Sequence, residues 1–494
     1  MSAAMPLSIL LDGIADAGAA GGVAVGGLTL DSRQVRQGDA FVALRGLHHH
    51  GIEFAPQAIE RGAAAILAET PLADLPSSIS RSPLIPIKDL SRHLSEVAGR
   101  FFGCPVRDMR LIGVTGTNGK TSTVQFIAQA LHALGRPSGS IGTLGSGRVG
   151  ALESGERTTP DAIAVQQTLV RLRDTGAVFV AMEVSSHALV QGRVEALPFE
   201  LAVFTNLTRD HLDYHGTMAA YGAAKARLFD WPGLRQAVIN VDDAFGRELA
   251  QRLPAGIVRL CYGVETEGAE VVARDVTSHD DGTDFRLVTP WGEALVSSRL
   301  LGRFNVSNLL AVAAALGALE VSFDDIVKAL SALEPVPGRM NRVGGGAQPL
   351  VVVDYAHTPD ALRQTLATLR AHTRGRLICV FGAGGDRDRG KRPEMARAVE
   401  ALADLAFVTD DNPRSEEGDA IVADIMAGFA APSRVRIERA RDRAIAQAVM
   451  LAHAGDTVLI AGKGHETYQE SHGERYPFDD LAEARRALAE VARC

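Results

Sequence analysis

Short apolar segments alternate with polar loops and with helical spacings of apolar residues along most of the chain. Because each apolar segment leads into a polar loop and then a helical pattern, the alternation predicts parallel strands wrapped by helices. The segments that carry this pattern are residues 111–114, 178–182, 201–205, 237–241, 350–353, 377–381, 405–408 and 458–461.

A break in the pattern divides this region into two parts. Pro335, Pro337 and Gly338 stand close together, and a helix cannot continue through them. Before residue 109, short apolar segments are separated by turn residues, which predicts a small mixed domain. We therefore predict an α/β fold with three domains: a small mixed N-terminal domain over 1–108, a central doubly wound parallel sheet over 109–335, and a C-terminal Rossmann-like α/β domain over 336–494.

Composition limits the class of protein. A chain of 494 residues with 46% apolar and 22% charged residues is typical of soluble globular proteins. The net charge of -8 argues against nucleic acid as the main partner. The four cysteines lack metal-site spacing and indicate a reducing compartment. The first 22 residues contain Asp12 and Asp16 but no Lys or Arg, which does not fit a signal peptide. No apolar run is long enough to cross a bilayer, so we expect a cytoplasmic protein and not an integral membrane protein. We also expect a monomer.

A glycine-rich loop follows the apolar segment 111–114 and precedes a helical pattern. Its glycines would let backbone N–H groups approach phosphate oxygens at the start of the helix. Lys120 would reach the β- and γ-phosphates of ATP, and the Thr121 hydroxyl would ligate Mg²⁺. Val114 stands where the strict pattern has glycine, so the loop is a variant, and the alternative is a glycine-rich turn without a ligand. The predicted ATP-binding residues here are Gly116, Thr117, Asn118, Gly119, Lys120, Thr121 and Ser122.

Three side chains at other strand ends could complete a nucleotide site. Glu183 suits a Mg²⁺ shell, although an acid at this position could instead cap the next helix. His211 could ligate a second Mg²⁺ or contact phosphate, and its alternative is a structural hydrogen bond. Asp354 could hold a ribose or nucleotide, or it could belong to a turn that caps the helix beginning near Pro359.

Two charged loops follow adjacent predicted strands of the last domain. Arginine side chains bind carboxylates through paired hydrogen bonds, whereas Asp and Asn can receive an ammonium group. Loops that carry both, residues 386–392 and 411–414, suit a zwitterionic amino acid. Either loop alone could equally be a solvated charged segment. A further acid, Glu466, follows the last predicted strand.

Together these segments resemble the Mur ligase family, the ATP-dependent enzymes that build the peptidoglycan stem peptide. The resemblance covers nearly the whole chain and rests on residues 115–121, 183–187, 205–213, 305–308, 338–340 and 354–359. It implies a UDP-substrate-binding domain over 1–108, an ATP-binding domain over 109–335 and an amino-acid-binding domain over 336–494.

Within the family, the sequence Asp-Asn-Pro-Arg at 411–414 resembles the form associated with meso-diaminopimelate, and lysine-adding relatives typically lack the arginine. The resemblance therefore implies ATP-dependent ligation of meso-diaminopimelate to UDP-N-acetylmuramoyl-L-Ala-D-Glu through an acyl phosphate, in peptidoglycan precursor synthesis. The residues it implies for the diaminopimelate pocket are Arg387, Asp411, Asn412, Arg414, Gly462 and Glu466.

The resemblance also implies residues for the other ligands. Those for the uridine or its phosphates are Leu30, Ser32, Leu47, His48 and His49. Those for the muramoyl-peptide arm are Thr158, Thr159, Ser185, Gln191 and Arg193, and Arg157 stands where some relatives have Asn. Asn308, Arg339 and Asp354 join the ATP site. Lys225 matches the family's carbamylated lysine. The metal ligands that the resemblance implies are Thr121, Glu183, His211 and Lys225. The catalytic residues that it implies are Lys120, Lys225 and His211.

Other functions remain open at this point. A P-loop kinase or simple NTPase would explain the glycine-rich loop but not the two charged loops of the last domain, and a non-catalytic nucleotide sensor would not need the metal-ligand set. Within the family, folate-polyglutamate and lysine-adding chemistry are the nearer rivals. The sequence does not identify a general base for the amine: His357, a carboxylate or the bound phosphate could serve. Closure of the last domain onto the middle one is expected, with 335–338 as the hinge.

Overall fold

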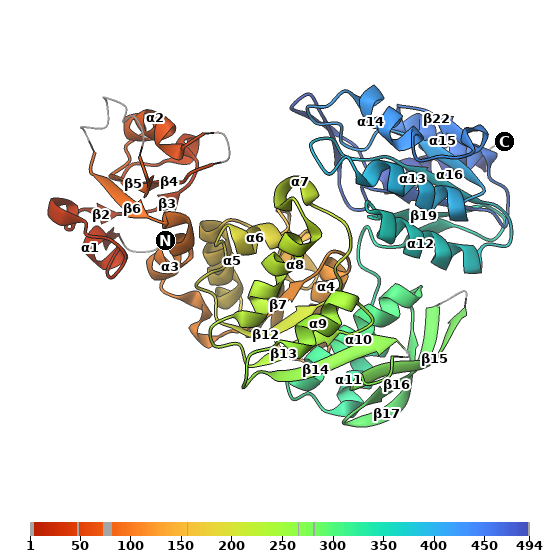
Figure 1. The fold of residues 1–494 in the computed structure, drawn as a ribbon, viewed down its shortest axis with the longest axis horizontal. Helices are drawn as coiled ribbons and strands as arrows, with labels where there is room; N and C mark the ends of the chain where they lie inside the picture. Colours follow the sequence, from red (N-terminus) through yellow and green to blue (C-terminus); the bar gives the residue numbers. More distant parts are fainter. Residues whose placement is uncertain are drawn as a thin grey trace. The chain divides into compact units, whose positions relative to one another are not determined.

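The computed structural model describes residues 4–46, 49–72, 82–155, 157–264, 266–279 and 282–492 (Figure 1). The chain forms two compact units. The first comprises Met1–Gly113, Arg136–Ala202 and Arg227–Leu234, and the second comprises Val114–Gly135, Val203–Ala226 and Arg235–Cys494. No helix within the described ranges has both the length and the apolar character required to cross a membrane.

A four-stranded parallel sheet with the order β3-β4-β5-β6 forms the N-terminal part of the first unit. Successive residues of β4 face opposite sides: Ala40 and Val42 join one apolar cluster, and Phe41 and Ala43 join the other. The strand is therefore buried on both faces, as its uninterrupted apolar sequence requires. The elements here are β1 (Met5–Pro6), α1 (Leu7–Leu10), β2 (Ala24–Val25), β3 (Leu28–Thr29), β4 (Ala40–Ala43), α2 (Ala55–Glu60), β5 (Ala65–Thr70), β6 (Leu84–Lys88) and α3 (Leu90–Phe101).

The largest sheet has the strand order β10-β9-β8-β11-β7-β12-β13-β14-β15-β16-β17. The boundary between the two units crosses β7 and β12, whose last residues belong to the second unit. The elements are β7 (Arg110–Thr115), α4 (Lys120–Ala133), β8 (Ser138–Gly142), β9 (Gly145–Arg148), β10 (Ala151–Glu153), α5 (Ala162–Asp174), β11 (Phe179–Glu183), α6 (Ser186–Val190), β12 (Phe199–Phe204), α7 (Leu212–His215), α8 (Met218–Ala226), β13 (Gln236–Asn240) and α9 (Ala244–Gln251).

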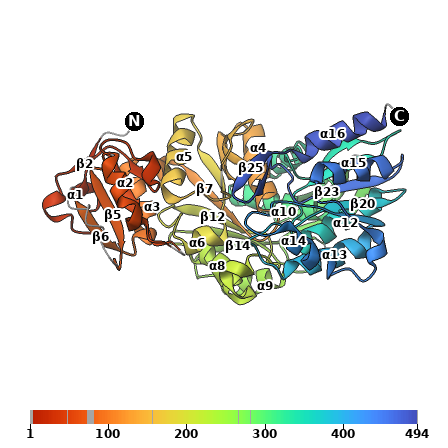
Figure 2. The same cartoon turned by 90° about the horizontal axis from the view of Figure 1, so that it is seen from above.

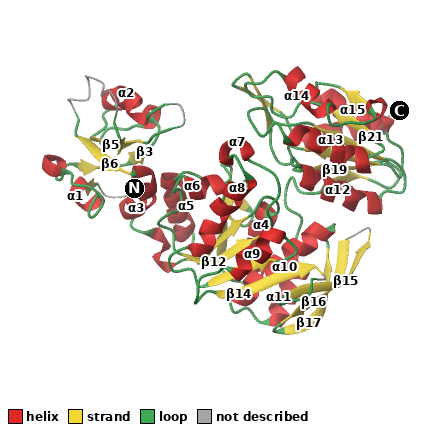
Figure 3. Cartoon of the chain, in the orientation of Figure 1, coloured by secondary structure: helices red, strands yellow, loops and turns green. Residues whose placement is uncertain are grey.

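Antiparallel strands extend this sheet, which the prediction of a doubly wound parallel sheet did not include. The pairs β15–β16 and β16–β17 are antiparallel, and Figure 3 shows these strands as a meander. Buried and exposed residues alternate along β17, the pattern of a strand with one solvated face. The elements are β14 (Val258–Val264), β15 (Val271–His279), β16 (Gly282–Thr289), β17 (Gly292–Ser298), α10 (Arg303–Ala318) and α11 (Phe323–Ser331).

A third sheet, with the order β18-β19-β23-β20-β21-β22, forms the C-terminal part of the second unit. All its pairs are parallel except β18–β19. The strands β24 (Tyr468–Ser471) and β25 (Glu474–Pro477) form a separate antiparallel pair. The other elements of this part are β18 (Asn341–Gly344), β19 (Leu350–Asp354), α12 (Pro359–His372), β20 (Leu377–Phe381), α13 (Lys391–Leu402), β21 (Leu405–Val408), α14 (Gly418–Met426), β22 (Val435–Ile437), α15 (Arg441–Leu451), β23 (Thr457–Ala461) and α16 (Asp480–Val491).

Helices cover both faces of this third sheet. Val352 packs with Leu366 of α12, whereas Val351 and Val353 pack with Ile445 of α15 and Leu488 of α16. Figure 2 shows α12 and α13 on one side of the strands and α15 and α16 on the other. The arrangement is doubly wound, so the loops after its parallel strands gather at one edge.

A buried ion pair joins α15 to α16. Arg441 Nε and Asp480 Oδ1 are 2.7 Å apart, both side chains are fully buried, and Arg441 also donates to the Ala461 carbonyl oxygen at 3.0 Å. We predict that Asp480→Asn lowers the free energy of unfolding by about 3–5 kcal/mol, because it leaves a buried guanidinium without its anion. Urea denaturation followed by circular dichroism measures the loss.

The matched control lies on the same helix. Glu483 pairs with Arg486 at the surface, so Glu483→Gln should change the unfolding free energy by no more than about 0.5 kcal/mol. Equal effects of the two substitutions would contradict the assigned role of the buried pair.

Candidate active site

The loop between β7 and α4 holds its backbone close to two neighbouring side chains. Gly119 has φ +83°, and a Cβ atom there would lie 2.6 Å from Asn308 Oδ1 of α10. A Cβ atom on Gly116 would collide with the Thr205 hydroxyl, which follows β12. Only glycine fits at these two positions, and the loop leads directly into the N-terminus of α4, the kind of helix end that attracts anions.

Two lysine side chains donate to the same backbone oxygen of this loop. Lys120 Nζ is 2.9 Å and Lys225 Nζ is 2.7 Å from the Gly116 carbonyl oxygen, and Lys120 also donates to the Thr117 carbonyl oxygen at 2.8 Å. Lys225 comes from α8 and is 1% exposed. Burial and the Lys120 ammonium hold the pKa of Lys225 well below its usual value, while Asp210 acts in the opposite direction. The environment of Lys225 therefore favours its neutral amine over its ammonium form.

Residues after β12 fix the conformation of the loop from one side. Thr205 Oγ1 donates to the Asn118 carbonyl oxygen at 2.6 Å, and Asn118 N donates to Asn206 Oδ1 at 2.8 Å. The Thr117 hydroxyl donates to the Thr208 carbonyl oxygen at 3.1 Å. These contacts preorganise the loop before any ligand arrives.

The start of the C-terminal part reaches the same loop. Arg339 donates to the Thr121 hydroxyl at 3.1 Å, and its guanidinium lies 4.5 Å from the centroid of the Tyr355 ring. Asp354, at the end of β19, accepts from Met340 N at 2.8 Å. Burial raises the pKa of Asp354, and Arg339 opposes that shift. The structure thus brings Asn308, Arg339 and Asp354 to the loop region that sequence reasoning assigned to ATP.

A charged cluster connects the segment after β12 with the start of α13. Lys391 Nζ and Asp210 Oδ1 are 3.0 Å apart, with both side chains buried, and Arg209 Nε lies 3.0 Å from Asp388 Oδ2. His211 Nε2 lies 3.4 Å and His357 Nε2 lies 3.9 Å from Asp210 Oδ2. These ion pairs hold the second and third sheets' loops together within the second unit.

His357 is a neutral imidazole. Burial lowers its pKa to about 4, Lys391 contributes in the same direction, and Asp210 opposes them. Its Nδ1 lies 2.8 Å from the Tyr355 carbonyl oxygen. Because a carbonyl can only accept, Nδ1 carries the proton and Nε2 presents a lone pair.

Glu183 lies at the end of β11, in the first unit, and is 1% exposed. Its Oε1 accepts from Thr143 N at 2.7 Å, and its Oε2 accepts from the Thr143 hydroxyl at 3.2 Å. The Thr143 hydroxyl oxygen also lies within hydrogen-bond distance, 3.0 Å, of the Thr158 hydroxyl oxygen. The carboxylate is oriented by its neighbours and does not cap the next helix, where Ser185 is the capping residue.

The residues assigned to the muramoyl-peptide arm form one connected group in the first unit. The Thr159 hydroxyl donates to the Glu183 carbonyl oxygen at 2.8 Å, and its oxygen lies 3.1 Å from Ser185 Oγ. Arg193 donates to the Thr159 carbonyl oxygen at 2.7 Å and to Gln191 Oε1 at 2.9 Å. This group could hold a carboxylate or a peptide at the Arg193 end.

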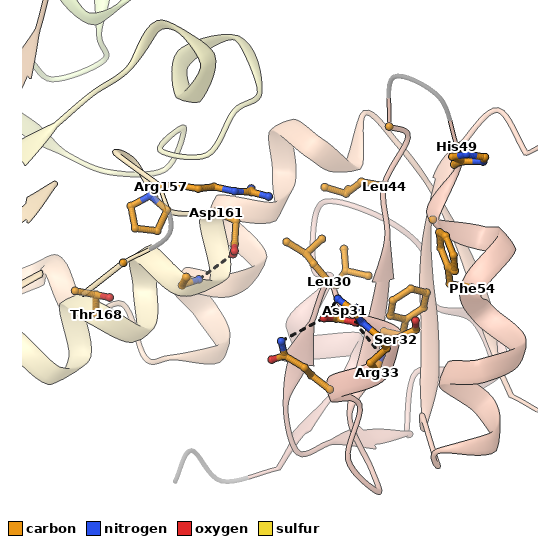
Figure 4. A pocket seen from close by; sticks show the side chains of 18 of the residues that line it. Leu30, Asp31, Ser32, Arg33, Leu44, His49, Phe54, Arg157, Asp161 and Thr168 are labelled. Carbon is orange, nitrogen blue, oxygen red and sulfur yellow. Dashed lines mark hydrogen bonds and ion pairs between the residues drawn. The ribbon is translucent and has the colours of Figure 1, made fainter. Parts of the chain in front are cut away.

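A cavity of about 980 Å³ opens in the first unit. Leu30, Ser32 and His49 line it from the N-terminal sheet, and Arg157 lines it from the segment before α5 (Figure 4). Ser32 Oγ donates to Gln57 Oε1 at 2.6 Å. The volume is in the range of small-molecule sites. Two other predicted residues of this site, Leu47 and His48, lie outside the described residues.

Polar side chains after β21 and β23 form a compact pocket wall. Lys463 Nζ lies 2.9 Å from Asn412 Oδ1, 3.5 Å from Asp411 Oδ1 and 3.3 Å from Glu466 Oε2. Asn412 Nδ2 donates to Glu466 Oε2 at 2.8 Å. Burial acts to raise the pKa of Asp411, but Lys463 and the nearby arginines bring it below its usual value. Burial and the Asp411 carboxylate raise the pKa of Glu466.

Two arginines adjoin this wall. A Cβ atom on Gly384 would lie 2.8 Å from Arg414 NH1 and 3.9 Å from Arg387 Cγ, which places both side chains beside one glycine. Arg414 has φ +55° and donates to the Gly385 carbonyl oxygen at 2.8 Å. Gly462 has φ +118°, and its Cβ position faces Asp411 Oδ2 at 3.2 Å. The two loops proposed for a zwitterion therefore meet in the structure.

Sequence reasoning assigned no role to Lys463 or Lys391. Lys463 stands between two glycines directly after β23, and this position at a strand end could have indicated a site residue. Lys391 begins α13 without a distinctive pattern, and only its contact with Asp210 identifies it. Both are cations that compensate buried carboxylates.

The residues present fit a magnesium ion that is held mainly by its nucleotide. Among the described residues, no group of three or more His, Cys, Asp and Glu side chains is arranged to hold a metal. Mg²⁺ usually takes one or two protein oxygens together with phosphate oxygens and water. The Thr121 hydroxyl, at the start of α4, can supply such an oxygen.

These features define an α/β protein with a glycine-rich loop of the phosphate-binding type and a separate cluster of charged and amide side chains at the edge of its third sheet. Three family models match the chain: Mur ligase family, catalytic domain, over residues 24–102; Mur ligase middle domain, over 114–316; and Mur ligase, glutamate ligase domain, over 338–464. The chain belongs to the Mur ligase family.

Similar proteins agree with this membership. A protein of Ectopseudomonas mendocina named UDP-N-acetylmuramoyl-L-alanyl-D-glutamate–2,6-diaminopimelate ligase is 55% identical over 98% of this chain and 98% of its own. A protein of the same name from Xanthomonas campestris pv. campestris is 56% identical over 99% of this chain and 98% of its own. A solved structure with that name has a TM-score of 0.70, is 38% identical and covers 99% of both chains.

The close approach at Gly119 generates a test of the phosphate loop. We predict that Gly119→Ala weakens ADP binding more than about tenfold, because a Cβ atom meets Asn308 at a positive φ. Isothermal titration with MgADP measures the dissociation constant.

Gly135, just beyond the other end of α4, is the matched control. It has φ +69° and no atom within 4 Å of its Cβ position. Gly135→Ala should lower stability by about 1 kcal/mol and leave ADP affinity unchanged. Unchanged ADP binding in Gly119→Ala would exclude the loop as the phosphate site.

Proposed function

We propose that the chain ligates meso-diaminopimelate to UDP-N-acetylmuramoyl-L-Ala-D-Glu at the expense of ATP, as an enzyme of peptidoglycan precursor synthesis. The observation that carries the proposal is the meeting of Arg387 and Arg414 beside Gly384, next to the cluster of Asp411, Asn412 and Glu466. The named relatives, similar over almost the full chain, support the same reaction. The substrates are small water-soluble molecules, and we propose that the enzyme acts in the cytoplasm as a monomer.

The proposed reaction has two steps. An oxygen of the D-Glu γ-carboxylate attacks the γ-phosphorus of ATP, ADP leaves, and an acyl phosphate forms. The amine of diaminopimelate then attacks the acyl carbon, phosphate leaves with the original carboxylate oxygen, and the nitrogen loses a proton. The first step requires cationic groups around the phosphates because negative charge accumulates there.

Lys120 is proposed to supply that charge. Its ammonium is held by the carbonyl oxygens of Gly116 and Thr117, at the position where a phosphate entering the loop would meet it. Arg339 donates to Thr121 and can reach the same anion. Bound Mg²⁺, with the Thr121 hydroxyl as its proposed protein ligand at the loop, would neutralise phosphate charge.

The amino-acid pocket matches diaminopimelate better than lysine. Diaminopimelate has a second amino-acid centre whose carboxylate lysine lacks, and a guanidinium binds a carboxylate through two parallel hydrogen bonds. Arg414 is proposed to bind that carboxylate, with Asp411 and Asn412 receiving the adjacent ammonium group. Folate-polyglutamate chemistry is disfavoured, because the first unit has a cavity lined by the proposed uridine residues.

The amino-acid preference is tested by ADP release with UDP-N-acetylmuramoyl-L-Ala-D-Glu. The wild-type enzyme should use meso-diaminopimelate at least about 100-fold better than L-lysine or L-ornithine, measured as kcat/KM. Arg414→Ala should lower kcat/KM for diaminopimelate about 100-fold and leave ADP affinity unchanged.

Arg397→Ala, at an exposed position of α13, is the control and should behave like wild type. Equal losses of ADP binding and diaminopimelate use in Arg414→Ala would refute the pocket assignment. Equal use of lysine by the wild type would refute the proposed amino acid.

Lys225 is proposed to carry a carbamate. A neutral amine attacks CO₂, and burial lowers the pKa of Lys225, which favours the neutral form. Carbamylation converts a potential cation into an anion that suits Mg²⁺. We predict a carbamate resonance in the ¹³C NMR spectrum of enzyme exchanged with ¹³C-bicarbonate, and its absence in Lys225→Arg.

The arginine variant keeps a long basic side chain but cannot form the carbamate, so its kcat should fall at least about 100-fold. Full activity of Lys225→Arg, or a fully active wild-type enzyme without the resonance, would exclude the modification.

A further inference from the structure

Tyr355, directly after the end of β19, contacts residues of two different proposed sites. Its hydroxyl donates to Glu466 Oε1 at 3.4 Å, and the centroid of its ring lies 4.5 Å from the guanidinium carbon of Arg339. Glu466 belongs to the proposed amino-acid pocket, and Arg339 belongs to the proposed ATP site. All three residues lie in the second unit. Neither set of proposed ligand contacts includes Tyr355 itself.

The Tyr355 hydroxyl and the pocket wall hold the two oxygens of Glu466 separately. Oε2 accepts from Asn412 Nδ2 at 2.8 Å and lies 3.3 Å from Lys463 Nζ, whereas Oε1 accepts from Tyr355. A carboxylate oxygen has two lone pairs, so Oε1 can also accept from the ammonium group of an amino acid. The Tyr355 hydroxyl therefore helps to set the direction in which Glu466 presents Oε1 to the amino acid.

The ring of Tyr355 supports Arg339. The Arg339 side chain donates to the Thr121 hydroxyl at 3.1 Å, while its Nε is buried and has no hydrogen-bond partner among the described residues. The negative face of an aromatic ring attracts a guanidinium, so the ring offsets part of the hydration that Arg339 has lost. The ring thereby holds the guanidinium beside the start of α4, where a phosphate would enter the loop.

Close backbone contacts fix the surroundings of Tyr355. A Cβ atom on Gly464 would lie 2.8 Å from Tyr355 Cβ and 2.7 Å from the Gly338 carbonyl oxygen. A Cβ atom on Gly338 would in turn collide with His465 N. The Tyr355 ring also packs against the His465 ring, with the two centroids 5.2 Å apart. The backbone beside the proposed ATP residues therefore packs directly against the backbone of the amino-acid pocket, with Tyr355 at the contact.

We infer that Tyr355 is a positioning residue for two substrates: its hydroxyl orients Glu466 for an ammonium group of the amino acid, and its ring orients Arg339 for the phosphates of ATP. This inference rests on the proposed function, because it uses the proposed ligands of Glu466 and Arg339. The two roles belong to different parts of one side chain. A substitution that removes only the hydroxyl therefore separates them from each other and from a purely structural role.

The first variant, Tyr355→Phe, keeps the ring and removes the hydroxyl. In ADP release with UDP-N-acetylmuramoyl-L-Ala-D-Glu, it should raise KM for meso-diaminopimelate about fivefold, because Glu466 loses one hydrogen bond. The ring still supports Arg339, so KM for ATP should stay within about twofold of wild type. The dissociation constant of MgADP, measured by isothermal titration, should also stay within about twofold.

The second variant, Tyr355→Leu, removes both the hydroxyl and the ring. It should raise KM for meso-diaminopimelate by a similar factor of about five. In addition, it should weaken MgADP binding about fivefold, because Arg339 loses the aromatic face. A structural role alone would make both variants lose both ligands in proportion to their loss of stability, which thermal unfolding followed by circular dichroism measures.

A double variant tests whether the hydroxyl acts through Glu466. Adding Tyr355→Phe to Glu466→Gln should change KM for meso-diaminopimelate less than about twofold, because the hydroxyl then has no carboxylate to orient. Tyr476→Phe is the matched control. It removes a hydroxyl that also donates to a glutamate, Glu474, but from an exposed position on β25. Its KM values should stay within about twofold of wild type.

A wild-type KM for meso-diaminopimelate in Tyr355→Phe would overturn the inference, and so would equal weakening of MgADP binding by Tyr355→Phe and Tyr355→Leu. In either case, diaminopimelate-dependent ADP release by the wild type would leave the proposed function intact. If the wild type releases no ADP with any amino acid, the proposed function fails. The role of the ring would then still be supported if only Tyr355→Leu weakened MgADP binding, and overturned if both variants bound MgADP equally.

Discussion

Two lysine side chains share one backbone oxygen, and much of the active-site chemistry depends on that arrangement. The Gly116 carbonyl accepts from both Lys120 and Lys225, with Lys225 fully enclosed. Burial and the Lys120 ammonium both lower the pKa of Lys225, which favours its neutral amine. Lys120 is the cation proposed to meet phosphate, and Lys225 is the amine proposed to be carbamylated. The glycines of the loop allow this arrangement because a side chain at Gly116 or Gly119 would displace Thr205 or Asn308.

Charge compensation also links the loops of the two larger sheets within the second unit. Asp210 is balanced by Lys391, and Arg209 by Asp388, so segments that are far apart in sequence meet through buried or half-buried ion pairs. Breaking one member of such a pair leaves a charge without compensation, which is costly. The proposed closure about residues 335–338 would have to form or break these ion pairs. The pairs would therefore contribute to the free-energy difference between the open and closed arrangements.

Much of this organisation follows from the sequence, and the rest depends on distant contacts. The apolar strands, the loop 115–121 and the charged loops after β20 and β21 were predictable, because strand ends of parallel sheets gather at one edge. The antiparallel meander β15–β17 was missed, since the strand–loop–helix rhythm was extended too far along the chain. The contact of Lys391 with Asp210 was not predictable, because it depends on which side chains meet across the fold. The roles of the site residues remain predictions.

The central claim is that the phosphate loop activates a carboxylate and does not merely hydrolyse ATP. The most direct test uses UDP-N-acetylmuramoyl-L-Ala-D-Glu with ¹⁸O in the D-Glu γ-carboxylate, together with ATP and meso-diaminopimelate. An acyl phosphate requires one ¹⁸O atom to appear in the released phosphate for each amide bond formed. Amide formation with unlabelled phosphate would contradict the account.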